Sequence, residues 1–336
     1  MILLDYNQVM MASLFASIGN HHNVEPDENL LRHMFLNSVR FNRKKFHKEY
    51  GEIVLCCDNP NVWRRDYFPY YKANRKKGRD ASDMDWNKLF ECIHRIRAEI
   101  EEFFPYKVIS IERCEADDII ATLVHEHGTI MNTGAEKILI LSGDKDFIQL
   151  QTYGNVDQYN PVMKKWVRHD NPDKYLEEHV LRGDVGDGIP NVLSPDNCLA
   201  VGTIQKPMTK KRITQFLSEP DTMDEETKLR FNRNKQMIDL SQIPSEYGDQ
   251  ILEQYNNAKE VGRQHLFNFF VKKKLKNLIT DIQDFRGIHP KLDSGLNYPT
   301  YGQVFAHKNG FQNNLSALDL FFNLGRSSWD YLNALK

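Results

Sequence analysis

Four short apolar runs, each closely followed by acidic residues, constrain the fold of this 336-residue chain more than any other feature. The runs lie at 1–5, 52–58, 106–111 and 137–141. Between them, apolar residues recur at spacings of three and four over 29–46, 86–103 and 116–125, which predicts helices. Because strands and helices alternate, the sequence predicts an α/β fold with a mostly parallel central sheet and helices on both faces.

The pattern changes at about residue 171, where strand signals end and helical periodicity takes over. Helices are predicted at 172–182, 209–217, 225–239, 246–256, 263–271 and 275–285. Residues 286–310 are rich in Gly and Pro and read as a linker, before an apolar tail at 311–336. We therefore expect an α/β catalytic domain at 1–170, a helical region at 171–285, the linker and the tail.

Composition excludes several classes of protein. Apolar residues make up 40% and charged residues 27%, as in folded globular proteins rather than disordered ones. No apolar run has the roughly 18 residues that a membrane helix needs. The apolar stretch 9–18 follows no basic segment, which argues against a signal peptide. Five scattered cysteines without metal-ligand spacing fit free thiols in a reducing cytoplasm.

Acidic residues follow the predicted strands and recur after the helix at 172–182. The nine candidates are Asp5, Asp58, Glu115, Asp117, Asp118, Asp144, Asp146, Asp184 and Asp187. Ligands bind at the carboxyl ends of parallel strands, so these positions should converge in one crevice. Because clustered carboxylates repel one another, the crevice would need divalent cations, and two Mg²⁺ ions with Mn²⁺ as a substitute suit such ligands. The cluster suggests metal-dependent hydrolysis of phosphodiesters.

The alternative explanation for any single acid is structural. An acid at the end of a strand is commonly a helix cap or a loop residue. Capping is the strongest alternative for Glu115-Ala-Asp-Asp118, because acids stabilise the N-terminus of a helix.

A basic and aromatic segment at 63–79 follows the second strand. Its candidate nucleic-acid contacts are Arg64, Arg65, Tyr71, Lys72, Arg75, Lys76 and Arg79. Cationic groups neutralise phosphates and aromatic faces stack on unpaired bases, so the segment predicts contact with nucleic acid. A solvated basic surface is the alternative. Further candidates are Gly188, Lys210 and Lys211, in and after a glycine-rich stretch at 183–191 that could approach phosphates or form a tight turn.

Several motifs together resemble a known family. They are Leu-Asp5, Cys-Asp58-Asn, Tyr-Lys72-x-Asn-Arg75, Glu115-Ala-Asp-Asp118, Gly-Asp144-Lys-Asp146-Phe and Gly-Asp184-x-x-Asp187-Gly-Ile-Pro. Over residues 1 to about 285 the chain resembles the 5′-nuclease (flap endonuclease) superfamily, and within it the ribonuclease H enzymes of phages. The resemblance implies a metal-dependent, structure-specific 5′ nuclease (5′→3′ exonuclease, flap endonuclease and RNase H) that removes RNA primers and 5′ flaps in lagging-strand replication.

The resemblance also assigns roles to the residues. It places Asp5, Asp58, Asp117 and Asp144 at a first metal site with Glu115 nearby, and Asp146, Asp184 and Asp187, with Asp118, at a second. The segment at about 60–100 would be a helical arch in which Lys72 and Arg75 contact the scissile phosphate. Residues 183–191 would begin a helix-three-turn-helix motif that grips duplex DNA and holds K⁺. The family's usual Gly-x-Gly-x-Lys-Thr hairpin is missing from 192–208.

The tail contains a candidate peptide for binding a sliding clamp, formed by Leu318, Leu320, Phe321 and Phe322. The flexible linker would tether it and raise the local concentration of the enzyme at its substrate. An amphipathic helix packing on its own domain is the alternative. The expected partners are DNA and RNA/DNA hybrids with 5′ ends or flaps, the clamp and a single-stranded-DNA-binding protein. The chain is expected to be a monomer in the cytoplasm of an infected host.

Two other classes of protein remain open at this stage. One is a phosphatase of the haloacid dehalogenase type, which needs Asp-x-Asp after its first strand, where this chain has Asp5-Tyr-Asn7. The other is a non-catalytic adaptor that binds DNA junctions and a clamp.

Overall fold

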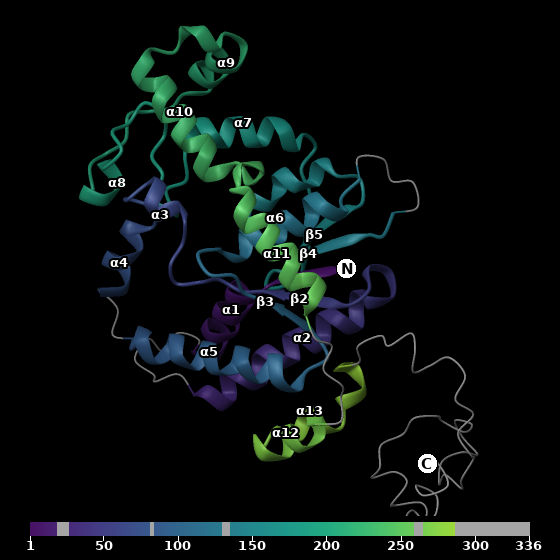
Figure 1. Ribbon diagram of the computed structural model, residues 1–336. Coiled ribbons are helices and arrows are strands. Elements are labelled where there is room, and N and C mark those ends of the chain that lie inside the picture. Colours follow the sequence, from purple (N-terminus) through teal and green to yellow (C-terminus); the bar gives the residue numbers. More distant parts are fainter. Residues whose placement is uncertain (19–26, 81–83, 130–134, 259–264, 286–336) are drawn as a thin grey trace, which may run out of the picture. The chain divides into compact units, whose positions relative to one another are not determined.

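The computed structural model describes residues 1–18, 27–80, 84–129, 135–258 and 265–285 (Figure 1). The predicted linker and the tail with its candidate clamp-binding peptide lie outside these residues. None of the helices within these ranges is long and apolar enough to cross a membrane.

A six-stranded sheet forms the centre of the molecule, with the strand order β3-β2-β1-β4-β5-β6. The strands are β1 (Ile2–Asp5), β2 (Ile53–Cys56), β3 (Lys107–Ile109), β4 (Ile138–Leu141), β5 (Val156–Asn160) and β6 (Lys165–Val167). All neighbouring strands are parallel except β6, which pairs antiparallel with β5. The predicted fold class is therefore confirmed.

Alternate residues of the inner strands face opposite layers of helices. Ile2 and Leu4 of β1 point into one apolar core, whereas Leu3 points into the other. Both faces are buried, which explains why these strands are continuously apolar instead of alternating between apolar and polar residues.

Helices cover both faces of this sheet. The first core includes residues of α1 (Tyr6–Ile18), α2 (Glu28–Tyr50), α5 (Trp86–Phe103) and α12 (Leu266–Lys272). The second includes residues of α6 (Ala116–His127) and α11 (Ser245–Asn257), which lie side by side in Figure 1. Two short helices, α3 (Arg64–Tyr67) and α4 (Ala73–Asp80), follow β2.

The C-terminal part of the described chain is helical, as predicted. Its other elements are α7 (Pro172–Arg182), α8 (Cys198–Val201), α9 (Lys210–Ser218), α10 (Glu225–Ile238), α13 (Lys276–Ile279) and the 3₁₀ helices η2 (Pro220–Thr222), η3 (Leu240–Gln242) and η5 (Ile282–Phe285). Val180 of α7 and Met237 of α10 pack with Phe68 and Tyr71, next to α3. The helical region therefore contacts the basic segment directly.

The elements that were not predicted include α1, β5, β6 and the 3₁₀ helix η1 (Asp146–Thr152). Helix α1 buries Val9 and Met10, and the sequence interpretation considered this stretch only as a signal peptide. Strands β5 and β6 are partly polar. β6 is the edge strand and none of its three residues is buried, whereas β5 lies between β4 and β6 and has two partly buried residues out of five. The helix η1 lies between β4 and β5 in the chain.

Candidate active site

Five of the predicted acids line one cavity of about 540 Å³: the four aspartates Asp5, Asp58, Asp117 and Asp144, and Glu115. Asp5 ends β1, Asp58 and Asp144 follow the neighbouring strands β2 and β4, and Asp117 comes from the first turn of α6. The complete lining is Asp5, Asn7, Gln8, Met11, Asp58, Lys72, Arg75, Arg79, Trp86, Phe90, Glu115, Asp117 and Asp144. Segments that are more than a hundred residues apart in the chain therefore meet at the carboxyl edge of the sheet.

Hydrogen bonds hold these carboxylates in place. Asp5 accepts one from the Gln8 backbone N–H at 3.1 Å and one from the Ser142 hydroxyl at 3.0 Å. Asp58 accepts one from the Ala116 N–H at 2.7 Å, at the start of α6. Each carboxylate keeps further oxygen lone pairs, because a carboxylate has about four acceptor positions.

The electrostatics of the cavity favour a bound cation. Burial, and then the charge of Asp58, raises the pKa of Asp5 to about 7. Burial and Asp146 raise the pKa of Asp144 to about 6, and burial also raises the pKa values of Asp58 and Asp117. Ionising all four aspartates together is therefore unfavourable unless positive charge is added to the cavity. A cluster of oxygen donors of this kind fits hard divalent ions.

Glu115 differs from these four because it has cationic partners. Its carboxylate lies 2.5 Å from the Lys72 ammonium and 3.2 Å from the Arg64 guanidinium, and it accepts a hydrogen bond from the Tyr71 hydroxyl at 2.7 Å. Burial alone would raise the pKa of Glu115, but Lys72 and Arg64 lower it to about 2. Glu115 is thus ionised without a metal.

Asp118 does not line the cavity, so the structure does not bring it together with the other predicted metal ligands. Its side chain is 0% exposed and lies 2.8 Å from the Arg64 guanidinium. The same carboxylate accepts hydrogen bonds from the Trp63 ring N–H at 3.2 Å and the Glu115 backbone N–H at 2.9 Å. The capping alternative considered for this acid therefore describes Asp118 in the structure.

The basic segment is divided between buried and accessible side chains. Arg64 and Tyr71 are each 3% exposed and take part in the internal network around Glu115, so the structure does not place these two predicted contacts at the surface. Arg65 and Arg75 are exposed, and Arg79 lines the cavity.

The remaining predicted nucleic-acid contacts lie outside the cavity lining. Lys210 and Lys211 are exposed in the first turn of α9, and Gly188 is buried beside the start of α4. Lys76 lies within α4.

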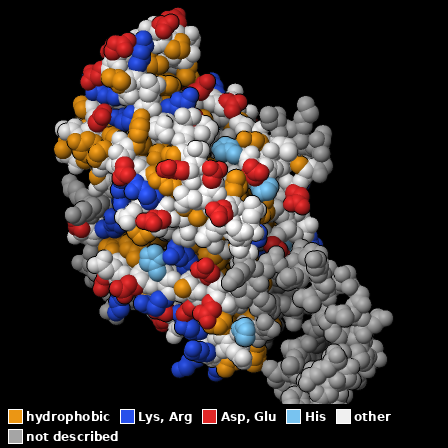
Figure 2. Space-filling view, in the orientation of Figure 1, with side chains coloured by type: hydrophobic (Ala, Val, Ile, Leu, Met, Phe, Trp, Pro, Cys, Tyr) orange, Lys and Arg blue, Asp and Glu red, His pale blue; other side chains and the backbone are white. Residues whose placement is uncertain are grey.

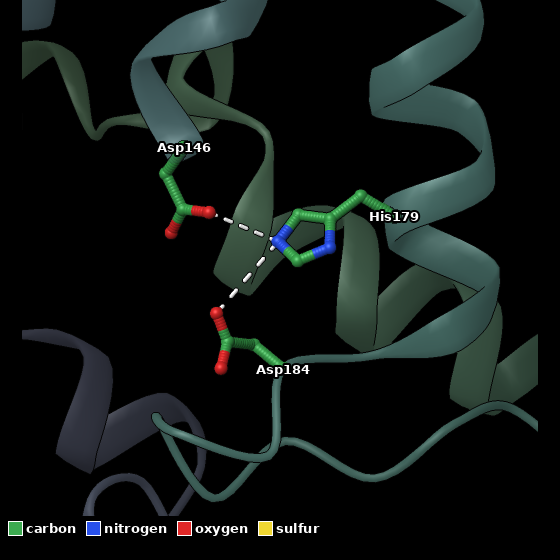
Figure 3. Close-up of side chains that lie close together, drawn as sticks. All are labelled: Asp146, His179 and Asp184. Atoms are coloured by element: carbon green, nitrogen blue, oxygen red, sulfur yellow. Dashed lines mark hydrogen bonds and ion pairs between the residues drawn. The ribbon is translucent and has the colours of Figure 1, made fainter. Parts of the chain in front are cut away.

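A second group of acids lies around the loop that follows α7. The Asp146 carboxylate is 2.9 Å from the Nε2 atom of His179, and Asp184 is 3.7 Å from the same atom (Figure 3). Asp187 instead pairs with Arg75 and lies 3.5 Å from the Lys72 ammonium. Asp146 and Asp184 thus lie beside the His179 imidazole, whereas Asp187 lies beside the cations of the basic segment.

His179 was missed by the sequence interpretation, which did not consider this histidine. The sequence contained one indication of this contact between a histidine and the acids. His179 lies in the last turn of the predicted helix 172–182, and Asp184 follows it by five residues. Its proximity to Asp146 depends on the packing of α7 against η1, which the sequence pattern does not specify.

Figure 2 shows Lys and Arg side chains and Asp and Glu side chains scattered among each other on the described part of this face. On this face the charges are interspersed, in agreement with the net charge of -2. A contact with nucleic acid on this face would therefore depend on particular exposed cations rather than on a uniform positive field.

Comparisons with known proteins agree with this geometry. Residues 1–180 match the family model of the 5′-3′ exonuclease N-terminal resolvase-like domain, and residues 172–285 match that of the T4 RNase H C-terminal domain. The ribonuclease H of Enterobacteria phage T4 is 32% identical over 295 residues, which are 84% of this chain and 95% of that protein.

Two further similar proteins are more distant. A 5′-3′ exonuclease of Buchnera aphidicola subsp. Acyrthosiphon pisum is 30% identical over 157 residues, which are 44% of this chain and 50% of that protein. A solved structure of the bacteriophage T5 flap endonuclease with DNA and metal ions has 15% identity and a TM-score of 0.49, over 84% of this chain and 98% of that one. On the two family matches and the T4 relative, the chain belongs to the 5′-3′ exonuclease family of metal-dependent nucleases, with a C-terminal domain of the T4 RNase H type.

Proposed function

We propose that this chain is a two-metal, structure-specific 5′ nuclease that removes RNA primers and 5′ flaps during lagging-strand replication of a phage type. The observation that carries the proposal is the convergence of Asp5, Asp58, Asp117 and Asp144 on one cavity that Lys72 also lines. Membership of the 5′-3′ exonuclease family supports the reaction, and the similarity to T4 ribonuclease H supports action on RNA as well as DNA. The phosphatase and adaptor alternatives have no such support.

The proposed cofactor is a pair of Mg²⁺ ions, for which Mn²⁺ can substitute. The four aspartates of the cavity would hold the first ion, and Asp146, Asp184 and Asp187 would surround the second, partly through water. When bound, such ions lower the pKa of a coordinated water and neutralise charge on the phosphate that is attacked. The oxygen donors of the cavity and the raised pKa of Asp5, about 7, fit this cofactor.

Lys72 and Arg75 are proposed to stabilise the charge that develops on the scissile phosphate. In the structure the Lys72 ammonium lies 2.5 Å from Glu115, and Arg75 pairs with Asp187. A phosphate entering the cavity would compete with these two carboxylates for the cations. The carboxylates therefore keep both cations aimed toward the cavity before substrate arrives.

DNA binding is assigned to cations of the basic segment at 63–79 and of α9. Arg65 and Arg79 would contact the single-stranded 5′ end beneath the arch, together with Lys76. Lys210 and Lys211 would contact the adjoining duplex. Residues 183–191 would form the proposed helix-three-turn-helix loop with its K⁺ ion, which the positive φ of Gly188, 74°, supports because such loops turn on glycines.

Two protein partners are proposed for this chain. Leu318, Leu320, Phe321 and Phe322 would dock on a sliding clamp, and a single-stranded-DNA-binding protein would share the substrate. The enzyme would act as a monomer in the cytoplasm of the infected host. A clamp-binding assay with the full chain and with a chain ending at residue 310 tests the tail, and equal binding by both would remove it from the proposal.

The nuclease activity is tested with a labelled 5′ flap substrate and its RNA-ended counterpart. Asp144→Asn should abolish cleavage, because it removes charge from the cavity, and should leave DNA affinity within about a few fold. Arg65→Gln provides a contrast, since it should weaken binding while the bound substrate is still cleaved. Cleavage by Asp144→Asn at a rate near that of the unaltered chain would exclude Asp144 from the mechanism. Binding without cleavage by the unaltered chain would favour the adaptor.

A further inference from the structure

Asp146, His179 and Asp184 form a compact group of potential metal ligands. One atom from each side chain lies within 4.8 Å of the other two. Figure 3 shows the Nε2 atom of the imidazole between the two carboxylates, at 2.9 Å from Asp146 and 3.7 Å from Asp184. All three side chains are only partly buried, so an ion and its water ligands can reach the group.

Each member of the group is held by its own element. Asp146 begins η1, and its carbonyl accepts a hydrogen bond from the Gln149 amide at 2.8 Å. His179 lies on α7, where its ring stacks on Tyr175 with the ring centres 5.7 Å apart. Asp184 follows Gly183, and its second carboxylate oxygen accepts the Asp187 backbone N–H at 3.1 Å. The group is therefore preorganised, which metal sites require.

We infer that His179 supplies a nitrogen ligand to the second metal position, and that this position consequently prefers Mn²⁺ or Co²⁺ to Mg²⁺. The inference rests on the proposed two-metal function and adds a ligand to it. Mg²⁺ binds oxygen ligands almost without exception, whereas imidazole suits the first-row transition metals. Replacing one oxygen ligand by imidazole thus changes the metal preference of one site and leaves the carboxylate site unchanged.

A different explanation fits the same distances, namely a structural ion pair between a protonated imidazole and two carboxylates. The two explanations make opposite predictions about metals. A structural pair would be disrupted equally by any divalent ion that reached the carboxylates, and the imidazole would contribute nothing to the affinity. A ligand contributes to the affinity for transition metals alone.

The test measures metal binding rather than cleavage. Mn²⁺ binding is followed by the electron paramagnetic resonance signal of free Mn²⁺, and Mg²⁺ binding by its competition with Mn²⁺. The proteins are the full chain, His179→Gln and His125→Gln. His125 is a matched control, because its ring is also hydrogen-bonded, to the Tyr153 hydroxyl and the Leu240 carbonyl, at the far end of α6 from Asp117.

We expect His179→Gln to weaken Mn²⁺ binding at one site by at least about tenfold and Mg²⁺ binding by less than about threefold. His125→Gln should change neither. With Co²⁺, the visible absorption of the full chain should change on His179→Gln as the nitrogen ligand is lost. His179→Asn, which is shorter, provides a second variant if the glutamine variant does not fold.

Equal losses for Mn²⁺ and Mg²⁺, or no loss for either, would overturn the inference and leave a structural ion pair. Failure of the proposed function is a separate result, because it would appear as absence of flap cleavage by the unaltered chain with every metal tested. A chain that cleaves flaps but shows the same metal preference with and without His179 would refute only the role of the imidazole.

Discussion

At the scale of single residues, Arg64 links the basic segment to two buried acids, Glu115 and Asp118. Its guanidinium lies 3.2 Å from Glu115 and 2.8 Å from Asp118, and it donates a hydrogen bond to the Met237 carbonyl at 3.2 Å. The side chain is almost completely buried. Arg64 therefore compensates two buried carboxylates and joins α3 to α10.

Arg64→Met should destabilise the protein by about 3–5 kcal/mol, because the buried Asp118 loses its cation and Glu115 keeps only Lys72. Urea unfolding measures the change. Arg65→Met is the matched control, since the neighbouring Arg65 is exposed and its loss should cost within about 0.5 kcal/mol. A cost below about 1 kcal/mol for Arg64→Met would show that the network does not stabilise the fold.

At the scale of elements, the start of α4 is attached to the loop at 184–188. The Lys72 N–H donates to the Asp187 carbonyl at 2.7 Å, and the Asn74 amide donates to the Val185 carbonyl at 2.6 Å. Lys72 itself has a positive φ of 55°, which is strained for a residue with a side chain. The attachment holds the proposed phosphate-contacting lysine beside the loop acids.

Gly188→Ala should loosen this attachment. A Cβ at Gly188, whose φ is 74°, would lie 2.9 Å from the Tyr70 carbonyl oxygen, so the backbone must shift. Gly202→Ala is the matched control, because Gly202 has a φ of 80° and nothing within 4 Å of the added atom.

We expect about 1–2 kcal/mol of destabilisation for Gly202→Ala from the left-handed backbone alone, and more for Gly188→Ala. Urea unfolding measures both variants. Flap cleavage should fall for Gly188→Ala and not for Gly202→Ala. Equal effects of the two variants would show that crowding at the attachment is unimportant.

At the scale of the whole molecule, the buried carboxylates make stability depend on pH in opposite directions with and without metal. Without metal, the pKa values of Asp5 and Asp144 are about 7 and about 6, above the ordinary value of 3.8. The folded state then holds protons that the unfolded state has lost, so stability falls as pH rises from about 4 to about 7. Above that range the loss is complete.

Melting temperatures near about pH 5 and about pH 8, with a chelator and with Mg²⁺, check this prediction. The chelated protein should melt at a lower temperature at the higher pH. Mg²⁺ at ~100 times its dissociation constant should add about 2.7 kcal/mol per site and should act more strongly at the higher pH, where the ligands are ionised. A chelated protein that becomes more stable as pH rises would contradict the raised pKa values.

Binding to a non-cleavable flap should weaken steeply with salt, because phosphate contacts release counterions. Replacing Lys210 and Lys211 together by Ala should reduce the slope of log affinity against log salt by about 2, one for each phosphate contact. Fluorescence anisotropy over a salt series measures the slope. An unchanged slope would remove α9 from the proposed duplex contact.

Much of this architecture follows from the sequence pattern alone. The apolar runs at 1–5, 52–58, 106–111 and 137–141 predict parallel strands, and parallel strands bring their carboxyl ends to one edge. The convergence of Asp5, Asp58 and Asp144 is therefore implied by local patterns. Strand β6 was not predictable in this way, because it has only three residues and none of them is buried.

The sequence by itself determined that the chain alternates strands and helices and that acids gather at one edge of the sheet. Tertiary structure alone decided which acids face the cavity and which are neutralised. Asp117 lines the cavity, whereas its neighbour Asp118 pairs with Arg64, 54 residues earlier. The same holds for His179, which meets Asp146 only through the packing of α7 against η1. Adjacent residues on a helix point about 100° apart, so the protein around them decides the surroundings of each.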